Sequence, residues 1–129
     1  MKQGFVSPLL RRHPGPLSIR NQRNGVIVAD RILTAFDSEA RRTGLLGRDA
    51  FPPGHAMVIA PSNAVHTCFM RFPIDVAFVD RSGLVVKVRT SVKPWRVAAS
   101  LRAFAVIELP AGSLARSDTV AGDRLAITP

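Results

Sequence analysis

The chain has 129 residues, of which 47% are hydrophobic, and a formal net charge of +9. This length suits one domain with its own core, and no apolar run approaches the roughly 20 residues of a membrane span. The single cysteine excludes an internal disulfide and indicates no redox compartment. The apolar run at the start is too short and broken for a secretory signal, so we expect a cytoplasmic protein.

The basic excess raises the question of polyanion binding. Lysine and arginine number 18 against 9 acidic residues, and the stretch Arg81 to Arg102 contains no acid. Such a balance attracts nucleic acid or anionic lipid. However, most of the basic residues are arginines in an alanine-rich chain. In the stretch 81–102, Trp95 is the one aromatic residue on which a nucleic-acid base could stack. We therefore expect nucleic-acid binding to be weak.

The N-terminal part reads as an arm followed by the start of a domain. Residues 1–25 contain three prolines and a polar run before Gly25, which predicts a poorly structured arm whose leucines and Ile19 could still pack along the domain. A single β-rich domain is expected over residues 26–129. A strand pattern covers residues 26–35, and residues 37–47 are predicted to form the one helix of the domain. Asp37 or Ser38 can cap this helix, and Gly47 can end it.

The remainder of the chain is dominated by short strand patterns separated by turn residues. Residues 74–80 alternate apolar side chains with a period of two, as expected for a strand with a buried face. Pro73 predicts a bend before this strand, and Gly83 a tight turn after it. The spacing predicts a mainly β, single-domain sandwich or open barrel of about six or seven strands with one short α-helix. Further strands are expected at residues 56–60, 84–92, 104–109 and 124–128.

Four segments carry motifs of one family in the same order. Arg41–Arg48 is similar to the motif R-x-x-G-L-M-x-R at a helix end, and Phe72–Phe78 to a segment ending in P-[LI]-D-[IV]-x-F. Ile107–Gly112 and Ala121–Asp123 are similar to L-E-x-x-A-G and G-D. On these residues the chain resembles the domain-of-unknown-function 192 family over residues 27–128. The resemblance implies a compact, β-rich prokaryotic domain and no assigned activity.

Soft and titratable side chains gather just before Pro73. His66, Cys68 and Met70 are ligand types that suit Cu(I) or Zn(II), but a straight strand would separate His66 from Met70 by roughly 13 Å. We therefore expect no metal and no cofactor, with Cys68 and Met70 in the core. A hydrolase or transferase that uses Cys68 as nucleophile and His66 or His55 as base stays open, although no complete catalytic set is visible.

Two carboxylates, Asp75 and Glu108, interrupt apolar strands, where a charge is costly unless it is paired. One interpretation is structural. Asp75 would accept hydrogen bonds from backbone N–H groups or from an arginine, with Arg71 or Arg48 as the candidates. The other interpretation is that the carboxylates line a pocket.

The pocket hypothesis groups four residues from different motifs. His66 and Met70 would border the mouth, Glu108 would reach it from the neighbouring strand, and Arg48 would arrive from the helix end. We therefore predict a domain that binds a small ligand or a protein partner at a polar site on the central strand. The enzyme and the weak nucleic-acid binder remain alternatives.

Overall fold

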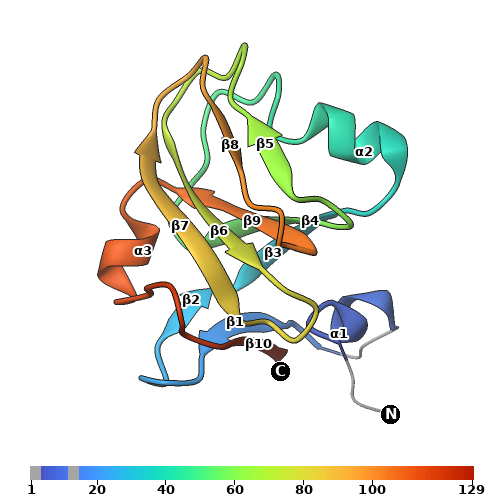
Figure 1. Cartoon of the computed structure of the whole chain (residues 1–129), viewed down its shortest axis with the longest axis vertical. Coiled ribbons are helices and arrows are strands. Elements are labelled where there is room, and N and C mark those ends of the chain that lie inside the picture. The colour runs from blue at the N-terminus through green and yellow to red at the C-terminus, as the bar shows by residue number, and fades with distance from the viewer. Residues whose placement is uncertain (1–3, 12–14) are drawn as a thin grey trace.

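The computed structural model describes residues 4–11 and 15–129, and its described part is mainly β (Figure 1). The strands are β1 (Ser18–Asn21), β2 (Ile27–Ala29), β3 (Arg31–Ala35), β4 (His55–Ile59), β5 (Ala64–His66), β6 (Ile74–Val79), β7 (Val85–Val92), β8 (Val97–Ala99), β9 (Ala105–Pro110) and β10 (Leu125–Thr128). The helices are α1 (Ser7–Leu10), α2 (Ser38–Thr43) and α3 (Ser113–Arg116). In this part of the chain, no helix has the length and apolar character needed to cross a bilayer.

A five-stranded sheet in the order β3-β4-β9-β6-β7 forms the centre of the fold. Its pairs are antiparallel except for β3 and β4, which run parallel and are joined by the connection that contains α2. Strand β9 lies in the middle, so Glu108 is opposite Met57 on one side and Val76 on the other. All six residues of β6 and all six of β9 are buried, which requires that both faces of the sheet be covered.

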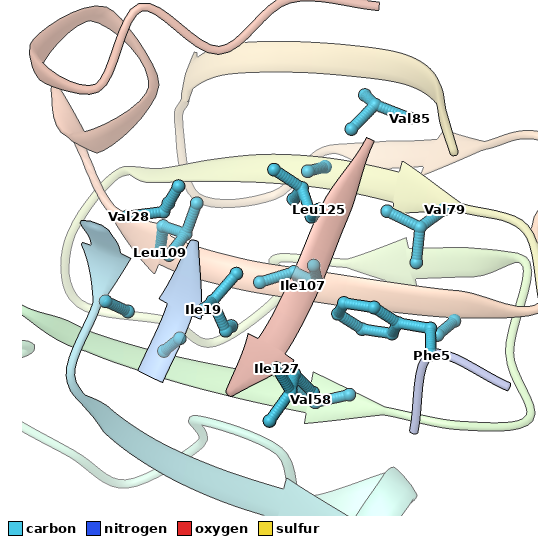
Figure 2. Packing of buried hydrophobic residues seen from close by; sticks show 14 of the residues in the cluster. Phe5, Ile19, Val28, Val58, Val79, Val85, Ile107, Leu109, Leu125 and Ile127 are labelled. Atoms are coloured by element: carbon cyan, nitrogen blue, oxygen red, sulfur yellow. The ribbon is translucent and has the colours of Figure 1, made fainter. Parts of the chain in front are cut away.

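The first face of this sheet is covered by a three-stranded sheet in the order β10-β1-β2. Figure 2 shows the side chains that meet there, with Ile19 and Ile127 over Ile107 and Val58. Ile19, Val58 and Ile107 are fully buried, as expected for the interior of a β-sandwich. This side of the molecule is therefore an apolar core.

One glycine is required where the two sheets meet. Gly83 lies in the turn between β6 and β7 with φ of 91°, a conformation that favours glycine. A Cβ atom at this position would lie 2.3 Å from the carbonyl oxygen of Leu125 in β10. Any side chain would push β10 away, so the turn and the sandwich depend on the same residue.

The second face of the five-stranded sheet packs against α2 and against the two-stranded sheet β5-β8. Met57, Val76 and Val106 point to this side, because side chains alternate along each strand. Glu108 shares this parity with Val106, and it therefore points toward α2 and β5 rather than into the sandwich core. The sheet thus separates an apolar layer from a layer that contains a carboxylate.

Within residues 4–11 and 15–25, the structure is more ordered than the poorly structured arm that the sequence suggested. Residues 18–21 form β1 at the centre of the three-stranded sheet, and Phe5 near α1 is 5% exposed. Ile19, Leu9 and Leu17 pack in or against the first core layer, which their apolar character allowed, whereas the pairing of β1 with β2 and β10 is not visible in the local sequence. The part of the arm prediction that concerns residues 1–3 and 12–14 lies outside the described residues.

The mainly β class is as predicted, but the described part has ten strands and three short helices rather than about six or seven strands and one helix. The strand pattern at residues 26–35 is divided at Asp30, so β2 and β3 belong to different sheets. In the alternating stretch 66–70, His66 alone belongs to a strand, because Phe69 has φ of 66° in a turn. The predicted bend before β6 is thus longer than Pro73 alone indicates.

Candidate functional site

A cavity of about 370 Å³ lies on the second face of the central sheet, between α2 and β5. The helix and the chain that follows it form one wall, and β5 with the following turn forms the other. Strands β4 and β9 supply the sheet side. The lining residues are Ser38, Arg41, Arg42, Thr43, Gly44, Leu45, Leu46, Ile59, Ser62, Ala64, Val65, His66, Met70 and Glu108.

Glu108 is the acidic group of this cavity. It is 4% exposed, and its carboxyl makes no hydrogen bond or ion pair with any residue that the structure describes. Burial raises the pKa of the Glu108 carboxyl from 4.5 to about 7, because the charged form loses its hydration. The carboxyl is therefore poised between its neutral and ionised forms near neutral pH.

Helix α2 positions the basic groups of the cavity. Asp37 accepts a hydrogen bond from Ala40 N at 2.7 Å and caps the helix start, as one of the two predicted caps. Gly44, with φ of 47°, ends the helix three residues earlier than predicted. Arg41 and Arg42 therefore occupy the last turn, and both line the cavity. Both arginines belong to the predicted helix, and Arg41 also to a family motif, but neither was predicted as a site residue.

His66 and Met70 lie on the opposite wall from α2, at the two ends of a turn held by Thr67. Thr67 is fully buried, and its hydroxyl donates to Lys93 O at 2.6 Å and accepts from Arg96 N at 2.9 Å. These bonds tie the turn to the segment before β8. His66 is exposed at the rim, whereas Met70 is 7% exposed within the second core layer. The structure therefore brings His66, Met70 and Glu108 to one cavity.

Arg48 does not join this group, so this part of the pocket prediction is wrong. Its side chain is exposed, and the cavity is lined by the preceding Leu45 and Leu46 instead. Gly47 has φ of 80° and turns the chain after Leu46, which leads Arg48 away from the cavity. Because the helix ends at Gly44, the basic residues that line the cavity are Arg41 and Arg42 of the last helical turn rather than Arg48.

Asp75 is engaged entirely by backbone groups. It is 1% exposed, and its carboxylate accepts hydrogen bonds from Ser91 N at 2.9 Å, Gly112 N at 3.1 Å and Leu114 N at 2.9 Å. These bonds join β6 to β7 and to the start of α3. The partner is therefore the backbone, which was one of the two kinds of partner expected for this carboxylate.

Arg71 does not contact Asp75, and the arginine alternative is wrong. Arg71 forms an ion pair with Asp49, and both side chains are exposed, at 62% and 81%. The turn before Pro73 directs Arg71 to solvent, whereas Asp75 points into the sandwich side of the sheet. Surface pairs of this kind contribute little to stability.

Cys68 is half-buried and does not line the cavity. No group of three His, Cys, Asp or Glu side chains that could hold a metal ion occurs within residues 4–11 and 15–129. Beside Cys68, Phe69 meets Trp95 with ring centroids 4.5 Å apart, and both rings are exposed, at 70% and 58%. Sequence reasoning missed this pair because the two residues come from different segments.

A second polar cluster was also missed. Asp123 is 5% exposed and accepts hydrogen bonds from Asn21 Nδ2 at 2.9 Å, Arg23 Nε at 2.6 Å and Val120 N at 3.0 Å. The Arg23 guanidinium beside it holds the pKa of the Asp123 carboxyl well below its usual range. This cluster ties the β1 end to the turn before β10, so its role is structural.

Comparison with known proteins gives a family and a fold. The model of the DUF192 family, described as "Uncharacterized ACR", matches residues 19–127. A proposed transcription regulator from Sinorhizobium meliloti 1021 is 23% identical with a TM-score of 0.74, over 85% of this chain and 90% of that chain. A protein of unknown function from Novosphingobium aromaticivorans DSM 12444 is 19% identical with a TM-score of 0.74, over 89% and 90%. No curated protein matches the sequence.

Proposed function

The chain belongs to the DUF192 family, and from its own geometry we propose that it is a small-ligand-binding domain. The cavity between α2 and β5 is the proposed site, with Glu108 as the group that holds the ligand. The family carries no described activity, and the two structural relatives indicate the fold alone. The proposal therefore depends on the residues of this chain.

The observation that carries the proposal is the contrast between the two buried carboxyl groups. Asp75 accepts three backbone hydrogen bonds and contributes to the fold. Glu108 is buried nearly as deeply, yet it has no partner among the described residues and borders an open cavity. A buried carboxyl without a partner costs free energy of folding. A site that must recognise a ligand accounts for such a group, because the ligand supplies the missing partner.

The hydrolase or transferase alternative receives less support. Its nucleophile Cys68 does not line the cavity, whereas His66 does. A catalytic pair needs the nucleophile and base within hydrogen-bond reach of a substrate. Glu108 remains available as a general acid or base, but a reaction would need a second group that engages the substrate. Binding is the simpler function for this set of residues.

A weak nucleic-acid interface is a second candidate, favoured by the exposed pair Phe69 and Trp95. Lys93 and Arg96 are exposed in the same segment as Trp95, so aromatic faces and positive charge occur together. This combination is typical of surfaces that stack single-stranded bases. This surface lies beside the two-stranded sheet β5-β8, and it does not use the Glu108 carboxyl.

Titration of the ¹⁵N-labelled protein with a fragment library tests the small-ligand proposal. We expect bound fragments to shift the amide signals of Gly44, His66, Met70 and Glu108, and Glu108→Gln to weaken most of them. Arg48→Gln is the matched control, because Arg48 is exposed and outside the cavity. Fragments that bind elsewhere on the chain, or none at all, would contradict the proposal.

A further inference from the structure

Charges of opposite sign line the α2–β5 cavity without neutralising each other. Glu108 belongs to the sheet side, and Arg41 and Arg42 belong to the helix wall. In the described residues, the ion pairs involve Arg23 and Arg71 instead, so neither helix arginine bridges to Glu108. Unlike charges in one partly enclosed site attract strongly, and their separation needs a structural cause.

The cause is the direction in which the two arginines are held. Arg41 donates to Phe36 O at 2.7 Å and to Ser38 Oγ at 3.4 Å, and Arg42 donates to Ser38 O at 3.4 Å. Both guanidinium groups are thus drawn toward the start of α2. The Glu108 carboxyl lies at the other end of this wall, where its Oε1 is 3.7 Å from the position of a Cβ on Gly44.

The length of the helix sets the scale of this separation. Ser38 and Gly44 are six residues apart, which corresponds to roughly 9 Å of helical rise. Leu45, Leu46 and Ile59 also line the cavity and supply apolar surface. The cavity therefore holds an acidic group near Gly44, basic groups held toward Ser38, and apolar lining.

Resting on the small-ligand function proposed above, we propose that the cavity binds a compact zwitterion. Its primary ammonium group would pair with Glu108, and its carboxylate or phosphate group would pair with Arg42. The ammonium would supply the partner that the buried carboxyl lacks, in an environment where such a charge-assisted bond is strong. Arg42 is the more exposed of the two arginines, and its guanidinium has the weaker internal bonds.

The pH dependence of this binding follows from the same groups. Arg41 and Arg42 from α2 and His66 from β5 are the other charged or titratable groups that line the cavity. The arginines stay charged at all relevant pH values. An ammonium group binds the ionised form of Glu108, so affinity should fall as the pH decreases below about 7. His66 is unchanged in a Glu108→Gln variant, which separates the two contributions.

The test uses probes that share a four-carbon chain and differ in charge. 4-Aminobutyrate, butylamine, butyrate and butyramide are titrated into the wild-type protein at pH 7.5, with cavity amide shifts as the readout. We expect 4-aminobutyrate to bind at least tenfold more tightly than any of the other three. A series from glycine to 6-aminohexanoate should show an optimum length, and phosphoethanolamine compared with β-alanine distinguishes phosphate from carboxylate.

Three variants assign the two ends of the ligand. Glu108→Gln should reduce the affinity for 4-aminobutyrate and butylamine about tenfold and leave butyrate unchanged. Arg42→Gln should reduce the affinity for 4-aminobutyrate and butyrate and leave butylamine unchanged. Arg48→Gln should change none of these. Arg42 is exposed on the helix, so its variant tests the proposal even if Glu108→Gln folds poorly.

The outcomes separate the two proposals. Butyramide or butyrate binding as tightly as 4-aminobutyrate would overturn the zwitterion inference and leave the small-ligand function intact. Fragments that occupy the cavity while no zwitterion of the series binds would have the same effect. If neither fragments nor any of these compounds shift the cavity amides, both proposals fail.

Discussion

Replacing Glu108 by glutamine should change how the stability of the protein depends on pH. The folded state holds the Glu108 proton with a pKa of about 7, compared with 4.5 for an exposed carboxyl. A raised pKa means that this group contributes most to stability below pH 4.5 and that the contribution is lost as pH rises through about 7. Glutamine is neutral at every pH and has nearly the same shape, so it should remove this loss.

The magnitude follows from the difference between the two pKa values. At about 1.4 kcal/mol for each pH unit, the ionised carboxyl should cost roughly 3 kcal/mol of unfolding free energy above pH 8. Glu108→Gln and the wild type should therefore agree within about 1 kcal/mol at pH 5, whereas the variant should be more stable by about 3 kcal/mol at pH 8.5. That difference is a large part of the stability of a domain of this size.

Urea unfolding at pH 5, 6, 7 and 8.5 measures this effect, with the free energy obtained by linear extrapolation. His66 is present in both proteins, so its contribution cancels in the difference between them. Curves that stay parallel across this range would refute the reasoning, because they would mean that Glu108 ionises without cost. Addition of a ligand that pairs with Glu108 should reduce the difference at pH 8.5.

The remaining predictions concern the fold and the basic surface. Asp75→Ala removes the acceptor of three backbone N–H groups and should lower the unfolding free energy in urea by roughly 3 kcal/mol. The surface variant Asp49→Ala should lower it by less than about 0.5 kcal/mol. Equal unfolding midpoints for the two variants would contradict this prediction. Asp123 has a lowered pKa, so its contribution is lost as pH falls below its ordinary value of 3.8, and Asp123→Asn should unfold with a weaker dependence on pH between 4 and 2. Single-stranded oligonucleotides should bind only weakly at physiological salt, and Lys93→Gln with Arg96→Gln should reduce the slope of log K against log salt by about 1.4. A sub-micromolar complex would show that the basic surface is a specific site.

The central sheet was predictable because its signals are local. Alternating apolar residues in β6 and the two carboxylates that interrupt β6 and β9 are visible in the sequence, as is the cap at Asp37. The resemblance to the family also agrees with the matched region. Alternation identified the strand, but both of its faces are buried rather than the one that was predicted. The same parity directs Glu108 and Asp75 to opposite sides of the sheet.

The other features depend on partners that are distant in the chain. Strand β1 forms only because β2 and β10 lie beside it, and the segment alone reads as a polar, proline-rich arm. The site prediction chose Arg48 because the helix was expected to end at Gly47. The helix ends instead at Gly44, and the basic group of the cavity moves to Arg41 and Arg42. A shift of three residues in a helix end is a small structural change, but it changes which side chains line the cavity.

The pairing of Ser18 with Thr128 places a constraint on folding during synthesis. The sheet that covers Val58 and Ile107 needs β10, which leaves the ribosome more than a hundred residues after β1. Until β10 emerges, Leu125 and Ile127 are missing from the apolar layer over this face of the sheet. Contacts between such distant segments slow folding, and intermediates with an uncovered sheet face are prone to aggregate. Completion of this apolar layer is therefore a late step in the folding of the nascent chain.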